Sequence, residues 1–465
     1  MTQSENPLWR WPALCEALNL PACPGPDIHQ ITIDSRHTDP GDLFIALSGD
    51  PGPRFHSSGS SGLDGHDFIA QAIQAGAAGV LLSRDMACDV PSLKVDDTLE
   101  GLWAIGATAR HRMQGLVTGI TGSSGKTTAR QWLEQLLRMA GRTHASVGSF
   151  NNHWGVPLSL ARMPEDSEFG VFEIGMNNPG EIAPLAELVN MDVAVVLNVL
   201  PAHLGRFEHI GQIREEKLSI ARGLKPGGRL VLPQVLAASA PAGADIVTFG
   251  FEPDATVRGS AHYTAQGAEV SVQIAGQQLS YRLTTGGEHR VQTSLSCLAV
   301  IHALGLEAAD FVGYMPDLTT PQGRGNRLQA GRHIIIDDSY NANPVSMRYA
   351  LQELAVAGDD CRKIAVLGEM LELGDDGIQM HRDIAQHCRG IDGVITVGEG
   401  FRDAGFEEAP TSFLGHFASA DDIPADWLDQ QLGDKGVLLV KGSNRVFWTR
   451  NFVNRLVTAL AENGQ

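Results

Sequence analysis

The stretch TGSSGKTT, at residues 121–128, constrains the fold of this chain more than any other feature. It follows the apolar run GLVTGI and precedes a long amphipathic pattern, so we expect a strand, a glycine loop and a helix in that order. Glycines in such a loop let backbone N–H groups approach phosphate oxygens, and the N-terminus of the helix adds positive potential. The stretch therefore predicts an α/β domain that binds a nucleotide.

Side-chain chemistry suggests individual roles within this loop. Lys126 is expected to neutralise phosphate charge, and the hydroxyl of Thr127 to bind Mg²⁺. The strict phosphate-loop pattern requires glycine at the position of Ile120, so the match is imperfect, but the flanking strand and helix favour phosphate binding over a plain turn. The residues expected to contact the nucleotide phosphates are Gly122, Ser123, Ser124, Gly125, Lys126, Thr127 and Thr128.

The length of 465 residues suggests roughly three domains at about 150 residues each. We place a small α/β domain at residues 1–95, where alternating apolar residues at 28–47 predict two short strands joined by a turn, followed by an αβ unit. A central parallel-sheet domain is expected at 96–318 and a third, Rossmann-like domain at 319–465.

Short apolar runs predict buried parallel strands in the second and third domains. In the central domain, residues 245–285 instead alternate polar and apolar side chains, which suggests a small antiparallel insert. The expected parallel strands are FGVFEIG, VAVVLNV and RLVLP in the central domain, and HIIIDD, KIAVLGE, GVITVG and GVLLVKG in the third.

Composition excludes several classes of protein. The net charge of −19 argues against a nucleic-acid-binding surface, and no apolar run approaches the ~18 residues of a membrane helix. Six scattered cysteines without a CxxC pair fit reduced thiols, and the N-terminal sequence lacks the pattern of a signal peptide. We therefore expect a cytoplasmic protein without membrane insertion, and we assign no chemistry to the Pro-, Gly- and Ser-rich residues 51–65.

Several motifs together resemble one enzyme family, the Mur ligases, whose phosphate loop is similar to GITGSSGKTT. The family's other motifs follow in the expected order along nearly the whole chain. The last three of them resemble the member that adds a terminal dipeptide. The matching stretches are IDSRHTDPGDLFIALSG, DGHDFIAQAIQAGAAG, SFNNHWGVPLSL, EIGMNNPGEI, NVLPAHLGRFEHIGQIREEKLSI, DDSYNANPVSM, LGEMLELG and KGS.

The resemblance implies an ATP-dependent amide ligase that works through an acyl phosphate. Its implied substrates are UDP-MurNAc-tripeptide, D-alanyl-D-alanine and ATP, and we expect a monomer. Two alternatives stay open: the diaminopimelate- or lysine-adding ligase of the same family, and a phosphate-loop protein that binds a nucleotide without catalysis. No DNPR motif of the former is present in the third domain, and the latter does not require the metal residues described next.

The resemblance also implies two Mg²⁺ sites. Glu173 follows a buried strand, where α/β folds place ligand-binding groups, and His203 follows another. Lys217, which by itself reads as a charge on a solvated helix face, is by resemblance a carbamylated lysine that holds Mg²⁺. The family's nearby glutamate is Ser219 here. The implied metal ligands are Thr127, Glu173, His203 and Lys217, of which the last three with Lys126 form the catalytic set.

Other implied contacts lie further along the chain. Arg324 resembles an arginine that reaches the nucleotide, and either Asp337 or Asp338 is expected at the ribose. His289 belongs to a segment implied to contact adenine, but Arg290 and Thr293 replace two asparagines frequent in the family. The residues implied to bind the precursor or the dipeptide are Ser35, Arg36, Asp64, His66, Asn151, Asn152, Asn341, Asn343, Lys441 and Ser443.

Overall fold

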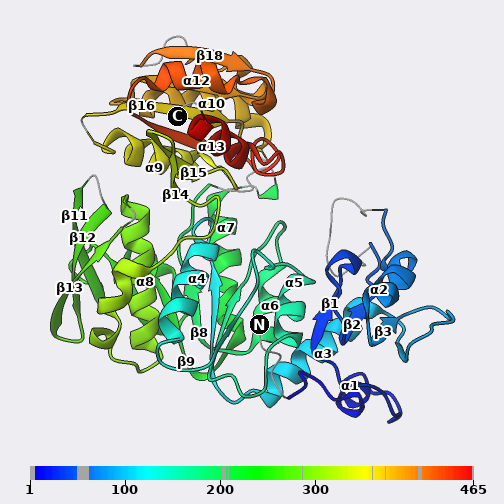
Figure 1. The fold of residues 1–465 in the computed structure, drawn as a ribbon. Helices are drawn as coiled ribbons and strands as arrows, with labels where there is room; N and C mark the ends of the chain where they lie inside the picture. The colour runs from blue at the N-terminus through cyan, green and yellow to red at the C-terminus, as the bar shows by residue number, and fades with distance from the viewer. Residues whose placement is uncertain are drawn as a thin grey trace.

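The computed structural model describes residues 6–49, 62–201, 206–207, 209–264, 267–284, 286–358, 360–371, 373–406 and 411–462. Most of segment 51–65 and the predicted metal ligand His203 therefore lie outside the described residues. Three sheets form in succession along the chain, each flanked by helices (Figure 1), and the predicted α/β class is confirmed. Within the ranges given, no helix has the length and apolar character needed to cross a bilayer.

The first sheet has four parallel strands in the order β1-β2-β3-β4. The two short strands predicted in 28–47 are present, but they are parallel neighbours, and a 3₁₀ turn at Ser35–His37 lies on the connection between them. The elements of this part are α1 (Trp11–Ala17), β1 (Gln30–Thr32), β2 (Asp42–Ile45), α2 (Ile69–Ala75), β3 (Gly79–Leu82) and β4 (Ser92–Lys94).

The central sheet has nine strands in the order β13-β12-β11-β10-β9-β8-β5-β7-β6. Helices cover both faces, because apolar side chains of every buried strand point alternately to either side. Its strands are β5 (Leu116–Thr121), β6 (Thr143–Ala145), β7 (Phe169–Glu173), β8 (Met191–Val196), β9 (Leu224–Pro233), β10 (Asp245–Gly250), β11 (Val257–Thr264), β12 (Gly267–Ile274) and β13 (Gln277–Leu283). Its helices are α3 (Thr98–Arg112), α4 (Lys126–Leu137), α5 (Gly155–Ala161), α6 (Ile182–Val189), α7 (Ile210–Leu218) and α8 (Glu288–Ala303).

The segment predicted as a small antiparallel insert is antiparallel only in its later strands, and it continues the central sheet. Strand β10 pairs in parallel with β9 and β11, and only β11, β12 and β13 form an antiparallel meander. The apolar side chains of this meander, including Val270 and Val272, pack with Leu295 of α8 in the same core as the parallel strands. Alternation within each strand could not reveal this continuity, because it depends on pairing with β10.

The first and central parts share a hydrophobic core. Leu102 of α3 and Leu158 of α5 are buried in the cluster that contains Trp9 and the first-sheet residue Leu43. The indole N–H of Trp9 also donates to the carbonyl oxygen of Ala161, at 2.8 Å. These two parts therefore pack as one unit.

The third part contains a six-stranded sheet in the order β14-β15-β19-β16-β17-β18. All four predicted strands are present and parallel, while the unpredicted β14 and β18 form its two edges. The elements are β14 (Asn326–Ala330), β15 (His333–Asp338), α9 (Pro344–Ala355), β16 (Arg362–Gly368), α10 (Gly377–Ile384), β17 (Gly393–Val397), α11 (Glu399–Arg402), β18 (Phe413–Phe417), α12 (Ala425–Leu432), β19 (Gly436–Lys441) and α13 (Phe452–Glu462).

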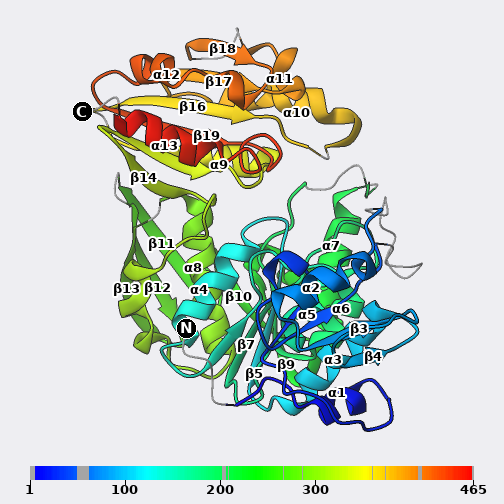
Figure 2. The same ribbon diagram turned by 45° about the vertical axis from the view of Figure 1, so that its right-hand side comes forward.

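Figures 1 and 2 both show the third part above the central sheet, with α9 on its lower side. The first part lies beside the central sheet and away from the third. The linker between the central and third parts runs through residues 319–325 and leads directly into β14. The central sheet and the third part therefore face each other across a single junction.

Candidate active site

Three adjacent strands of the central sheet end at one edge. Strand β5 lies between β7 and β8, with Ile120 paired to Glu173 and Thr121 paired to Val196. Carboxyl ends of parallel strands with helices on both faces are where such sheets bind ligands. The glycine loop after β5 and the groups after β7 and β8 therefore meet at the same place.

The glycine loop has the geometry of a phosphate site. Gly125 has φ of 81°, a left-handed conformation that favours glycine, and α4 begins at the next residue. The ammonium of Lys126 donates to the carbonyl oxygen of Gly122 at 2.8 Å. Burial lowers the pKa of Lys126, and the carboxylate of Glu173 opposes that effect. A phosphate group would give this buried cation a stronger partner.

Asn198, a residue that the motif analysis did not single out, holds the loop in place. Its side-chain oxygen accepts from the backbone N–H groups of Ser123 and Ser124, both at 3.0 Å, and its amide donates to the carbonyl oxygen of Ser124. The signal that could have identified it is its position, just beyond the buried strand β8.

Glu173 is placed to bind a cation. Its carboxylate is 1% exposed, and Oε1 accepts from the side-chain amide of Asn151 at 2.6 Å. The buried Oε2 has no hydrogen-bond partner among the described residues. Burying a carboxylate oxygen is costly unless it accepts a hydrogen bond or coordinates a metal. Glu173 Oε2 is therefore suited to bind Mg²⁺. Asn152, in contrast, accepts from the backbone N–H of Gly155, the first residue of α5.

Lys217 is not a solvated surface charge. Its side chain is 2% exposed, and burial followed by repulsion from Lys126 holds its pKa well below the usual value. This environment disfavours the ammonium relative to the neutral amine, which is the form that reacts with CO₂. Among the described residues, no group of three or more His, Cys, Asp or Glu side chains is arranged to hold a metal.

The third part contributes an ion pair at the ends of β15 and β19. The Lys441 ammonium donates to Asp338 Oδ2 at 2.6 Å and to the carbonyl oxygen of Asn341 at 3.1 Å. Asp337 instead accepts from the hydroxyl of Ser339 at 2.5 Å and is turned away. Of the two aspartates that the sequence left open, Asp338 is the one that lines the site.

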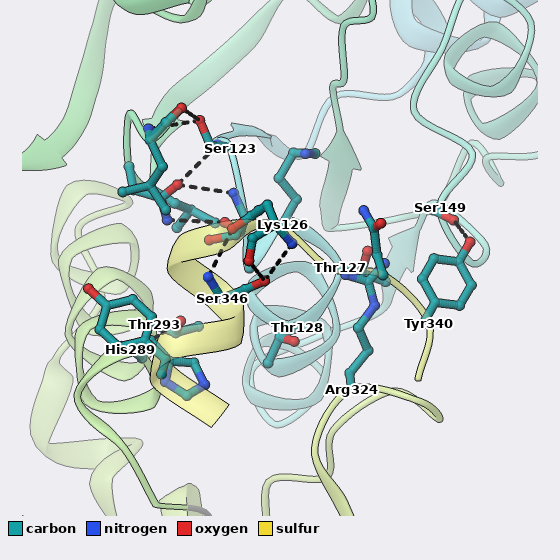
Figure 3. Close-up of a pocket in the computed structure, with 18 of the residues that line it drawn as sticks. Ser123, Lys126, Thr127, Thr128, Ser149, His289, Thr293, Arg324, Tyr340 and Ser346 are labelled. Atoms are coloured by element: carbon teal, nitrogen blue, oxygen red, sulfur yellow. Dashed lines mark hydrogen bonds between the residues drawn. The ribbon is translucent and has the colours of Figure 1, made fainter. Parts of the chain in front are cut away.

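Aromatic and basic groups bridge the central and third parts (Figure 3). The Tyr340 hydroxyl and the Ser149 hydroxyl are 2.6 Å apart, and the guanidinium of Arg324 lies 4.3 Å from the centre of the Tyr340 ring. On the other side, the His289 ring stacks on Tyr349 with 5.2 Å between centres. Burial lowers the pKa of His289 to about 3, so this imidazole is neutral at physiological pH.

These groups enclose a cavity of about 330 Å³. A cavity of this size is at the lower end of the range for small-molecule sites. The predicted residues that line it are Ser123, Ser124, Gly125, Lys126, Thr127, Thr128, Asn151, Glu173, His289, Arg324, Asp338, Asn341, Asn343 and Lys441. Those outside its lining are Gly122, Asn152, Lys217, Asp337 and Ser443, together with the four in the first part.

Asn343, which lines the cavity, and Ser443, which lies outside its lining, both form hydrogen bonds with backbone groups of the protein. Asn343 is the N-cap of α9, and its side chain accepts from the backbone N–H of Ser346 at 2.9 Å. The hydroxyl of Ser443 accepts from the backbone N–H of Leu371 at 3.0 Å, which connects the ends of β19 and β16.

The four first-part residues predicted to bind substrate lie on a different surface. Ser35 is buried and donates to Gln71 at 3.0 Å, and Arg36 is exposed and paired with Asp34. His66 is buried with both ring nitrogens engaged, one by Asp64 at 2.6 Å and the other by the backbone N–H of Ser83. His66 therefore stabilises the loop that contains Asp64 by connecting it to Ser83.

The fold and the cavity define a phosphate-loop protein in which a second α/β unit covers the nucleotide site. Comparison with known proteins agrees. A family described as the Mur ligase middle domain matches residues 120–301, and one described as "Mur ligase, glutamate ligase domain" matches residues 323–444.

Individual relatives match over most of their length. The UDP-N-acetylmuramoyl-tripeptide–D-alanyl-D-alanine ligase of Escherichia coli (strain K12) is 31% identical over 448 residues, which span 93% of this chain and 94% of the relative. Crystal structure I of MurF from Acinetobacter baumannii has a TM-score of 0.85 at 30% identity, covering 97% and 100% of the two chains. MurF from Thermotoga maritima in complex with ADP has a TM-score of 0.78 at 26% identity, covering 93% and 98%. The chain therefore belongs to the Mur ligase family, as its motifs predicted.

Proposed function

We propose that this chain is an ATP-dependent amide ligase that joins D-alanyl-D-alanine to UDP-MurNAc-tripeptide in peptidoglycan precursor synthesis. The observation that carries the proposal is the single cavity in which the phosphate loop and Glu173 face Arg324, Asp338 and Lys441 of the third part. The names of the E. coli, A. baumannii and T. maritima relatives support this member of the family over the diaminopimelate- or lysine-adding ligase.

The reaction requires activation, because a carboxylate is a poor electrophile. An oxygen of the precursor carboxylate attacks the γ-phosphorus of ATP, and ADP leaves. The amine nitrogen of the dipeptide then attacks the acyl carbon and loses a proton, and phosphate departs with the original carboxylate oxygen. Most of the catalysis is positioning and neutralisation of charge.

We assign these tasks to groups of the cavity. The glycine loop and Lys126 bind the phosphates, while Arg324 approaches them from the linker side. Asp338 and Lys441 lie on the side of the third part that lines the cavity. There the carboxylate of Asp338 is suited to accept a hydrogen bond from a ribose hydroxyl. Burial acts to raise the pKa of Asp338, but the adjacent cations Lys441 and Arg290 bring it below its usual value, so Asp338 is an acceptor.

We propose Mg²⁺ as the cofactor. Two sites are proposed, and Glu173 Oε2, the hydroxyl of Thr127, His203 and a carbamate on Lys217 would share the role of ligands between them. When bound, the cation would neutralise charge on the transferred phosphate. Asn151 would orient the Glu173 carboxylate through the hydrogen bond that its side-chain amide donates.

The uridine diphosphate of the precursor is assigned to the first part, at Ser35, Arg36 and the loop of Asp64 and His66. We further propose that the enzyme acts as a monomer in the cytoplasm and serves cell-wall growth, cell shape and division. All six cysteines are free thiols, as a reducing compartment allows.

Phosphate release tests the proposal. It should require ATP, UDP-MurNAc-tripeptide and D-alanyl-D-alanine together, and Lys126→Ala should reduce it by more than ~100-fold because a charge-stabilising contact is lost. Circular dichroism of the variant provides the folding control. Equal turnover with UDP-MurNAc-dipeptide and free diaminopimelate or lysine would instead identify the other ligase. Hydrolysis without either substrate would point to a nucleotide-binding protein without ligase chemistry.

A further inference from the structure

Arg290 occupies an unusual place for an arginine. It lies in the first turn of α8, is 6% exposed and lines the cavity. Its guanidinium reaches two separate elements of the site.

Two of its three nitrogens connect separate parts of the site. Nη1 donates to the hydroxyl of Thr128 on α4 at 3.3 Å, and Nη2 donates to the backbone carbonyl of Arg324 in the linker. The linker passes so close that a Cβ at Gly325 would lie 2.4 Å from Nη2, and Gly325 has φ of +84°. A side chain there would displace the guanidinium.

The linker in turn determines where the Arg324 side chain lies. Arg324 lines the cavity beside Thr128 and Lys126 and rests on the Tyr340 ring (Figure 3). Its backbone N–H donates to the carbonyl oxygen of Pro321 at 3.1 Å, so the segment is a tight turn. Holding the carbonyl of residue 324 therefore restricts its side chain.

The charge of Arg290 is matched by the third part of the molecule. Burial lowers the pKa of Arg290, and the carboxylates of Asp338 and Glu353 oppose this, while Arg324 adds to the lowering. Arginine stays protonated in proteins, so a cation is retained within electrostatic range of two carboxylates of the third part. This electrostatic match holds only while the third part covers the site.

The hydrogen bonding of Arg290 is incomplete, since its Nε has no partner among the described residues. A purely structural buried arginine in the same chain, Arg110, uses all three nitrogens on the carbonyl oxygens of Val189, Asn190 and Met113. Arg290 therefore bridges α4 and the linker with fewer hydrogen bonds than Arg110 makes.

We infer that Arg290 is a positioning residue that fixes the Arg324 side chain relative to the helix that starts at the phosphate loop. This inference rests on the proposed ligase function for its kinetic consequence. Arg324 faces developing phosphate charge, so misplacing it should lower kcat more than it weakens ground-state nucleotide binding. The hydrogen bonds of Arg290 go to Thr128 and Arg324 and not to Lys126 or the loop amides, so the principal phosphate contacts would remain in its absence.

A double-mutant cycle tests the inference. Arg290→Met keeps the volume and removes the donors, and we expect kcat to fall ~10-fold or more with the KM for ATP changed less than ~3-fold. In an Arg324→Ala background, Arg290→Met should have almost no further effect, because the group it positions is gone. Arg332→Met, which removes an exposed pair with Asp429 far from the cavity, should be additive with Arg324→Ala. Additive loss from Arg290→Met, or loss confined to ADP affinity and melting temperature, would overturn the inference.

A second measurement is independent of ligase activity. Hydrogen exchange of the amides of Arg324 and Gly325 should become faster in Arg290→Met and in the milder Arg290→Lys, but not in Arg332→Met. Unchanged exchange in both Arg290 variants would also overturn the inference. If the wild-type enzyme makes no product while the exchange result holds, the proposed function fails and the positioning role remains.

Discussion

Lys217 shows how far a single residue can depart from its local pattern. In the sequence REEKL it resembles one charge of an exposed helix, yet its amine is buried near Lys126. The packing that buries it comes from the end of α7 folding against neighbouring segments, which spacing along one helix does not reveal. A buried unmodified ammonium beside Mg²⁺ would add like charge, whereas a carbamate reverses the sign.

Substitution of Lys217 tests the carbamate directly. We expect Lys217→Ala to be nearly inactive and partly restored by acetate or formate, which supply the missing carboxylate. Lys217→Gln should not be restored, since its amide fills the space without negative charge. Turnover measured with and without added carboxylate is the readout, and wild-type turnover should not change on the addition. Normal activity in Lys217→Ala would return this residue to a structural role.

The two aspartates at the end of β15 illustrate a different limit. Side chains of neighbouring residues in a strand point to opposite faces of the sheet, so those of Asp337 and Asp338 are expected to point in opposite directions. It does not say which face meets the nucleotide, because that depends on how the third part covers the central one. In the structure, Asp338 pairs with Lys441 of the neighbouring strand β19 and lines the cavity, whereas Asp337 does not line it.

At the scale of elements, α9 carries both structure and cavity lining. Asn343 forms a capping box with Ser346, and Tyr349 one turn further on stacks on His289. The motif analysis expected Asn343 to bind substrate, while its side-chain oxygen is used at the helix end. Substitutions can separate the contribution of Asn343 to the stability of α9 from a contact of its side chain with the dipeptide.

We expect Asn343→Ala to lower the free energy of unfolding by about 1 kcal/mol, the usual value of an N-cap. Asn343→Asp and Asn343→Ser can also cap, so they should restore stability and keep the KM for D-alanyl-D-alanine near that of the wild type. Denaturant unfolding and initial rates are the measurements. A rise in that KM in the stable Asp and Ser variants would show that the amide contacts the dipeptide.

The parallel strands were predictable because each is a short, buried apolar run next to a helical pattern. The edge strands β14 and β18 were not, since NRLQA is largely polar and FLGHF contains a glycine. The glycine loop and Glu173 were predictable from their places at strand ends. Asn198 and Tyr340 were not, because their partners lie 74 and 191 residues away in sequence.

At the scale of the whole molecule, the first and central parts form one packed unit, and the third part completes the site. We therefore propose that the boundaries near residues 95 and 318 differ in kind, with only the second acting as a hinge. The shared core of α3, α5 and the first sheet supports the rigid boundary. The junction at the cavity instead includes local contacts such as the hydrogen bond of Tyr340 with Ser149 and the stacking of His289 on Tyr349.

Removing that contact should weaken closure without disturbing either part. We expect Tyr340→Phe to reduce kcat/KM for ATP by ~2- to 10-fold, the value of one net hydrogen bond, while its ring still supports Arg324. Ser149→Ala should have the same effect, and the double variant should be no worse than either single one. Steady-state rates provide the readout. Independent losses in the two single variants would mean that the hydrogen bond does not form during turnover.

The fate of one oxygen atom tests the central claim most directly. UDP-MurNAc-tripeptide labelled with ¹⁸O in its acceptor carboxylate would be incubated with ATP and D-alanyl-D-alanine, and released phosphate examined by ³¹P NMR and product by mass spectrometry. We predict one ¹⁸O in each phosphate formed, with the dipeptide joined to the precursor in equal amount. Unlabelled phosphate, or labelled phosphate without new amide product, would contradict ligation through an acyl phosphate at this site.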